Sequence, residues 1–122
     1  MIKSYRDLIV WQKSMDLAVE VYRLSRLLPP SERYGLASQL QRSAAAIPAN
    51  IAEGHERGSR GDFRRQVSVA RGSLAELETH LELAERVGVL PRTEVQATDS
   101  RIAEVGRMLT VLLRRLKRET RP

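Results

Sequence analysis

Apolar residues recur at steps of three and four along most of the chain, and prolines and glycines interrupt this pattern at three places. The steps match the 3.6-residue turn of an α-helix and predict amphipathic helices rather than strands. The interruptions are Pro29 and Pro30, the glycine-containing segment 54–61, and the segment 88–91. Each one predicts a helix end. The sequence therefore predicts four helices, at about residues 5–28, 33–53, 60–87 and 93–118.

Each predicted helix carries a stripe of apolar side chains that we expect to face a common core. Aromatic residues make up only 4% of the chain, so this core must consist of Leu, Val, Ile and Ala. Pro48 lies inside the second stripe, and because the pattern resumes after it, we expect one bent helix. The stripes are Leu8, Trp11, Met15, Ala18 and Tyr22, flanked by Leu17, Val21, Leu24 and Leu28; Leu36, Leu40, Ala44, Ile47 and Ile51; Phe63, Val67, Ala70, Leu74, Leu77, Leu81 and Ala84; and Val95, Ile102, Val105, Leu109, Leu112 and Leu116.

Polar residues at three predicted helix starts have the spacing of a capping box, in which two side chains satisfy backbone N–H groups reciprocally. Gly88 is the expected cap at the end of the third helix. The three pairs are Ser4 with Asp7, Ser59 with Asp62, and Thr93 with Gln96.

Short connections between amphipathic helices make neighbouring helices antiparallel. The sequence therefore predicts an all-α, antiparallel up-and-down four-helix bundle that forms a single domain over residues 1–122. A helical repeat or an extended hairpin is the alternative.

The composition indicates a soluble cytoplasmic protein with a basic surface. There is no cysteine for a disulfide or a thiolate site, no apolar leader at the N-terminus, and no apolar run long enough to span a membrane. The net charge of +6 comes from eighteen arginines against three lysines. Guanidinium groups bind phosphates and carboxylates in bidentate fashion, which favours nucleic acid or an acidic protein as the partner.

The usual catalytic and metal-binding patterns are absent from the sequence. A bundle can hold a di-metal centre when two helices supply Glu-x-x-His, but residue 77, three before His80, is leucine, and His55 lies near a helix end. Neither a Gly-x-Ser-x-Gly nucleophile motif nor a phosphate-binding loop occurs. The run Glu76, Glu78, His80 and Glu82 is interpreted as a solvated face. We expect no enzyme activity, no metal and no cofactor.

Basic residues concentrate in two stretches that an up-and-down bundle places at the same end. There, with Lys3 and Arg6 nearby, they would form one basic pole that binds phosphates. The competing interpretation is that the C-terminal arginines complement the negative end of a helix dipole. The stretches are Arg57, Arg60, Arg64 and Arg65, and Arg114, Arg115, Lys117, Arg118 and Arg121.

The second and third predicted helices carry two further features that a single bundle does not need. Polar residues beside the core stripe of the second helix suggest a hydrogen-bonded network in which Arg42 pairs with Glu53 or Glu76; a solvated stripe is the alternative. Small residues on the same two helices, some of them outside the core stripes, suggest a surface for self-association. The polar residues are Gln39, Arg42, Asn50 and Glu53, and the small ones are Ser43, Ala44, Ala45, Ala46, Ala49, Ala52, Ser68, Gly72 and Ala75.

Four segments together resemble the proteins encoded in intervening sequences of bacterial 23S rRNA genes. They are residues 7–13 (DLIVWQK), 32–42 (ERYGLASQLQR), 47–54 (IPANIAEG) and 70–78 (ARGSLAELE). The accessory variability determinant of diversity-generating retroelements is similar to these proteins in fold and in its basic surface.

This resemblance implies a homopentamer of four-helix bundles and a role with structured RNA or with a nucleic-acid enzyme. The family's polar positions correspond to Gln39, Arg42, Asn50, Glu53 and Glu76, which we interpret as architectural. We therefore predict a non-enzymatic, oligomeric protein that binds nucleic acid, RNA in particular, through the basic pole. The alternative is an oligomeric scaffold for an acidic protein or for a nucleic-acid enzyme such as a reverse transcriptase.

Overall fold

The apolar stripes of the sequence form α-helices in the computed structural model, which describes residues 2–119. Within that range the chain forms four α-helices and two short 3₁₀-helices. They are η1 (Tyr5–Asp7), α1 (Ile9–Ser25), η2 (Pro30–Glu32), α2 (Leu36–Glu56), α3 (Arg60–Arg86) and α4 (Arg92–Glu119).

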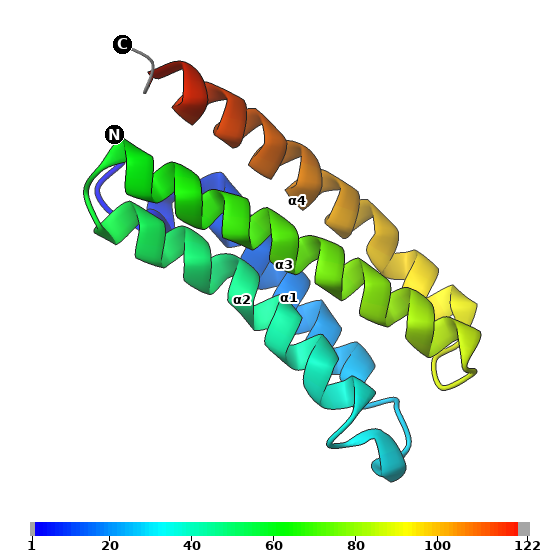
Figure 1. Ribbon diagram of the computed structural model, residues 1–122. Helices are drawn as coiled ribbons and strands as arrows, with labels where there is room; N and C mark the ends of the chain where they lie inside the picture. The colour runs from blue at the N-terminus through cyan, green and yellow to red at the C-terminus, as the bar shows by residue number, and fades with distance from the viewer. Residues whose placement is uncertain (1, 120–122) are drawn as a thin grey trace.

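The four helices form the predicted up-and-down bundle (Figure 1). Each helix packs against the next one along the chain, and α1 also packs against α4, which closes the bundle; over residues 2–119 the backbones of diagonally opposite helices do not approach each other closely. The N-terminal end, the α2–α3 connection and the end of α4 all lie at one end of the molecule. The all-α, single-domain prediction is confirmed.

The first helix is shorter than the expected range of 5–28 at both ends. The backbone of Leu8 is extended and separates η1 from α1. At the other end the N–H groups of Arg26, Leu27 and Leu28 bond to carbonyls three residues earlier, so the last turn tightens before Pro29. The second helix begins and ends three residues later than expected and continues through Pro48 without a break.

Two predicted caps form fully, one forms in half and one does not form. Ser4 and Asp7 make a complete capping box. Gly88 has a φ of 82°, and the N–H groups that follow α3 bond back to the carbonyls of Ala84 and Glu85, as in a Schellman motif. Ser59 accepts a bond from the N–H of Asp62, but the Asp62 carboxylate binds Arg65 instead.

The capping box expected of Thr93 and Gln96 is wrong. The helix α4 begins two residues earlier than that pair requires, so Thr93 lies inside its first turn. The carbonyl of Pro91 accepts bonds from the N–H groups of Glu94 and Val95 there. Proline starts a helix readily because the N–H that it lacks would have had no partner within the helix.

Aliphatic residues from all four helices fill the core, as the composition requires. The stripes of α2, α3 and α4 are buried along most of their predicted length. On α1 the burial differs from the prediction: Leu17, Val21 and Leu24 are fully buried, whereas Met15 and Tyr22 are 39% and 38% exposed. The apolar face of α1 is therefore wider than the core that it covers.

Gly54 lies where α2 comes very close to α3. A β-carbon built on this buried residue would lie 2.7 Å from Cβ of Gln66 and 3.2 Å from Cδ1 of Phe63. A contact of 2.7 Å between carbon atoms is a clash, so only glycine allows the two helices to lie at this separation. By contrast, a β-carbon on Gly61, in the first turn of α3, would meet nothing within 4 Å.

We expect Gly54→Ala to lower the free energy of unfolding by about 1–3 kcal/mol, because α2 and α3 must move apart to admit the methyl group. Gly61→Ala is the matched control and should raise stability by up to about 1 kcal/mol, because it restricts the unfolded chain without a clash. Urea denaturation followed by circular dichroism measures both changes. Equal effects of the two substitutions would show that the contact at Gly54 does not limit the packing.

Candidate functional site

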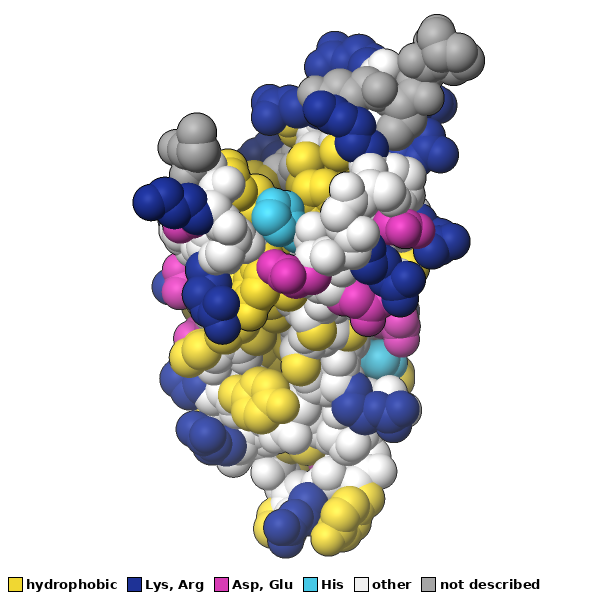
Figure 2. Space-filling model, turned by 90° about the vertical axis from the view of Figure 1, so that its left-hand side faces the viewer, with side chains coloured by type: hydrophobic (Ala, Val, Ile, Leu, Met, Phe, Trp, Pro, Cys, Tyr) yellow, Lys and Arg dark blue, Asp and Glu magenta, His cyan; other side chains and the backbone are white. Residues whose placement is uncertain are grey.

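The bundle brings the two predicted basic stretches to the same end of the molecule (Figure 1). The first stretch lies at the end of α2 and the start of α3, and the second lies on the last turns of α4. Lys and Arg side chains gather at this end in the space-filling view (Figure 2). We call this surface the basic pole and define it by Arg57, Arg60, Arg64, Arg65, Arg114, Arg115, Lys117 and Arg118. Arg121 lies outside the described residues.

Acidic neighbours occupy some of the guanidinium groups of the pole. Arg57 lies 3.3 Å from a carboxylate oxygen of Glu53, and Arg65 lies 2.8 Å from one of Asp62. Both pairs join residues three or four apart on one helix and are exposed, so they hold their partners weakly. A second group of arginines makes no hydrogen bond or ion pair with another described residue. These are Arg64, Arg114, Arg115 and Arg118.

The N-terminal turn is fixed beside the pole through the carboxylate of Asp7. Its Oδ2 atom accepts bonds from the backbone N–H groups of Lys3, at 2.7 Å, and Ser4, at 3.1 Å. These two bonds lower the pKa of Asp7 below its ordinary value, with the Lys3 bond contributing more. Gln12 on α1 donates to the carbonyl of Arg6 at 2.8 Å and ties the turn to the bundle.

The predicted polar network does not form among residues 2–119. Glu53 binds Arg57 rather than Arg42, and Arg42 and Glu76 make no ion pair with any residue from 2 to 119. Gln39 is also exposed. Half-buried Asn50 donates a bond of 2.7 Å to the carbonyl of Ala46, in its own helix. Pairing between copies of the chain stays a prediction.

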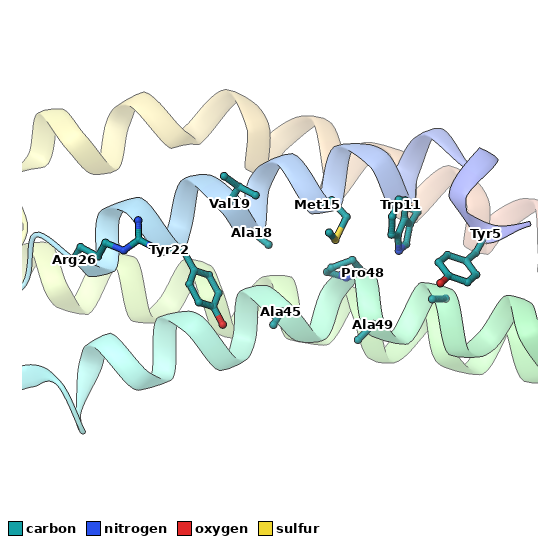
Figure 3. A pocket seen from close by; sticks show the side chains of 11 residues that line it. Tyr5, Trp11, Met15, Ala18, Val19, Tyr22, Arg26, Ala45, Pro48 and Ala49 are labelled. Carbon is teal, nitrogen blue, oxygen red and sulfur yellow. The ribbon is translucent and has the colours of Figure 1, made fainter.

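An open apolar groove of about 590 Å³ runs between α1 and α2. Figure 3 shows aromatic and aliphatic side chains of α1 facing small side chains of α2 across it. The groove contains three exposed apolar residues of α1, Met15, Val19 and Tyr22, of which Val19 is 67% exposed. Its lining residues are Tyr5, Trp11, Met15, Ala18, Val19, Tyr22, Arg26, Ala45, Pro48, Ala49 and Ala52.

Only one wall of this groove could be predicted from the sequence. The small residues Ala45, Ala49 and Ala52 were expected to form a surface apart from the core, and they line it. The opposite wall differs from the prediction, because Met15 and Tyr22 have the spacing of the core stripe of α1 but are exposed. Val19, an apolar residue outside that stripe, was the signal of a second apolar face.

Neither histidine lies in a metal-binding cluster of the described residues. No group of three or more His, Cys, Asp and Glu side chains comes together between residues 2 and 119. The Nδ1 atoms of His55 and His80 are buried and have no hydrogen-bond partner in the part of the chain that the structure describes, and the His55 ring packs edge-on against Phe63 with centroids 5.5 Å apart. Along the same range, no helix has the length and apolar character needed to cross a bilayer.

Comparison with known proteins gives a family and a similar structure. The model of a family described as the 23S rRNA-intervening sequence protein matches residues 6–111. One similar solved structure is the crystal structure of a protein of unknown function from the S23 ribosomal protein family of Bacteroides thetaiotaomicron. Its sequence is 27% identical to this chain, and the two structures superpose with a TM-score of 0.79. The similarity covers 86% of this chain and 98% of that one. No curated protein matches the chain.

We expect the N-terminal turn to loosen as the pH falls through the lowered pKa of Asp7. A depressed pKa in the folded state means that the charged carboxylate stabilises the turn above the ordinary value of 3.8, and that this contribution is lost on protonation below it. Trp11, the single tryptophan, packs against Tyr5 with centroids 5.3 Å apart and reports this change by fluorescence.

Asp7→Asn is the control for that titration. At neutral pH its Trp11 fluorescence should resemble that of the wild type in acid, because the amide accepts the two N–H bonds less strongly than the carboxylate does. The acid-induced change in the wild type should be largely absent from the variant. A change of the same size and midpoint in both proteins would assign it to another group.

Proposed function

Because the chain belongs to the 23S rRNA-intervening sequence protein family, we propose that it is a non-enzymatic RNA-binding protein that contacts the phosphate backbone through its basic pole. The observation that carries this proposal is the group of exposed arginines at one end of the bundle that have no acidic partner among the described residues. These are Arg64 on α3 and Arg114, Arg115 and Arg118 on α4.

Arginine is suited to this contact, because its planar guanidinium group donates two parallel hydrogen bonds to a phosphate. The four arginines come from two helices that are packed against each other. The phosphate backbone of an RNA that binds them is therefore held at more than one point. Such contacts fix an RNA in place without distinguishing its bases. The protein thus has little sequence preference of its own, and it selects RNA by shape and charge.

We expect binding of a fluorescent RNA hairpin to weaken steeply with salt, because each phosphate contact releases counterions. With four contacts, the slope of log K against log salt should be about −3, which corresponds to a roughly 50-fold loss of affinity between 50 and 200 mM salt. The double substitution Arg115→Glu and Arg118→Glu should weaken binding at least about tenfold at 100 mM salt and reduce the slope by about 1.5.

The matched control is Arg33→Glu with Arg92→Glu, which changes the net charge equally at helix connections away from the pole. Its affinity and salt slope should lie close to those of the wild type. Fluorescence anisotropy measures all three proteins. A salt-independent affinity, or an equal loss in both double variants, would refute binding through the pole.

We further propose that copies of the chain associate through the apolar groove between α1 and α2. The groove leaves apolar side chains of α1 exposed, and small residues on α2 let another helix approach its backbone closely. The resemblance to the family implies a pentamer. Association would also bring several basic poles together and multiply their contacts with one RNA.

Arg42 and Glu76 fit the same proposal. They face solvent on adjacent helices, and neither has an ionic partner in the described chain. A pairing between copies satisfies both charges and sets the register of the assembly, whereas a purely apolar interface leaves the register free.

We expect Val19→Glu combined with Ala49→Glu to dissociate the assembly, because both residues line the groove and a carboxylate there would lose its water on association. The monomer should remain folded, since both positions are exposed. Light scattering after gel filtration gives the mass. Val87→Glu, at a residue that is 56% exposed beyond the end of α3, is the control and should leave the mass unchanged. An unchanged mass in the double variant would place the interface elsewhere.

A further inference from the structure

A second open groove, of about 590 Å³, runs between α3 and α4 on a surface away from the α1–α2 groove. Apolar and small side chains form most of its floor, and Val111 is 50% exposed in it. Gly106 brings α4 close to α3: a β-carbon there would meet Cδ2 of Leu74 at 3.4 Å. The floor consists of Leu74, Ala75, Ile102, Ala103, Gly106, Thr110 and Val111.

Three arginines line this groove, Arg71 on α3 and Arg107 and Arg114 on α4. Arg107 and Arg114 are seven residues apart, so they project from the same face of α4 two turns apart. All three are exposed, and none makes a hydrogen bond or an ion pair with another residue in the described range. Arg86 and Arg92, further along the same two helices, differ in this respect. They form ion pairs with Glu82 and Glu85.

The charge along the α3–α4 contact changes sign. Glu78 lies at the other end of the groove from Arg114, and the adjoining depression contains the acidic residues Glu82, Glu85 and Asp99. A ligand that fits this surface therefore has an apolar face for the floor and negative charge along the half that lies over the arginines.

We propose that the α3–α4 groove binds an acidic amphipathic helix of a partner protein. Between Ile102 and Arg114 the groove follows α4 for about 18 Å, which matches a helical segment of roughly three turns. Leucine-like side chains of that helix cover the floor, and its carboxylates pair with Arg71, Arg107 and Arg114. A phosphate backbone fits less well, because its sugars and phosphates gain nothing from an apolar floor, and no aromatic ring lines the groove for a base to stack on.

The test uses the full chain and a synthetic fluorescent peptide of about 14 residues with leucines at helical spacing and glutamates beside them. We expect saturable binding of this peptide in fluorescence anisotropy. Two peptides serve as controls and should not bind: one with lysine at every glutamate position, and one with the same composition in scrambled order. The first tests the charge, and the second tests the apolar face.

Single charge reversals then locate the site. Arg71→Glu and Arg107→Glu should each weaken binding of the acidic peptide at least about tenfold, because each places two carboxylates together. Arg33→Glu is the matched control, at a residue whose contact is the ring of Tyr34, and it should bind like the wild type. Ala103→Phe fills the floor without a change in charge and should also weaken binding.

Four outcomes would overturn the inference. They are no binding of the acidic peptide, equal binding by the Arg107→Glu and Arg33→Glu proteins, displacement of the peptide by an RNA hairpin from the protein that carries Arg115→Glu and Arg118→Glu, and a lower oligomer mass in the Arg71→Glu protein. Because Arg114 lies in both the groove and the pole, competition by RNA in the wild type also follows from binding at the pole, so only displacement from the pole variant identifies RNA as the occupant of the groove. The fourth outcome identifies a second copy of the chain. Binding of RNA through the pole is measured separately, with the Arg115 and Arg118 variant, so either proposal can fail without the other.

Discussion

Burial of aliphatic side chains between four helices is the interaction on which the rest of the molecule depends. With few aromatic residues to fill space, the helices must lie close together, and the glycine at position 54 is required where α2 meets α3. Over the described residues the backbone of each helix lies close only to its neighbours around the bundle, and side chains of all four helices join one core. The core is therefore continuous, and every other face of each helix is available for contacts outside the bundle.

The topology converts distant stretches of sequence into one surface. The connection between α2 and α3 and the end of α4 are more than fifty residues apart, but an even number of antiparallel helices returns the chain to the end where it began. Basic residues in those two stretches thus share one pole. The grooves lie along the sides, one between α1 and α2 and the other between α3 and α4, and the second groove shares Arg114 with the pole.

Much of the fold could be predicted from the sequence, because apolar spacing and helix-breaking residues are local signals. The four helices, the cap at Ser4 and the Schellman turn at Gly88 depend on residues within a few positions of each other. Sequence reasoning failed where the answer depended on which neighbour a helix face meets. Met15 and Tyr22 look like core residues by spacing, but α1 has more apolar surface than the other helices can cover.

The same distinction between local signals and packing applies to the candidate sites. The position of the basic pole followed from topology, whereas the pairing of individual arginines depended on side-chain geometry: Arg57 and Arg65 bind acids on their own helices, and Arg64 does not. Arg42 was expected to pair with Glu53 or Glu76, but Glu53 is bound one turn further along by Arg57. The sequence signalled the groove between α3 and α4 only through Ala75, one of the small residues of the third predicted helix, because the groove forms only once the two helices are packed.

The basic pole contains seven arginines and one lysine, and this composition fixes its charge. A guanidinium group keeps its proton far above physiological pH, so the positive potential of the pole stays constant through any change of pH that a cell undergoes. Enzymes that acetylate lysine could neutralise only Lys117. A ligand held by this surface is therefore released by salt, by competition or by loss of the protein, rather than by a change in the protonation of the pole.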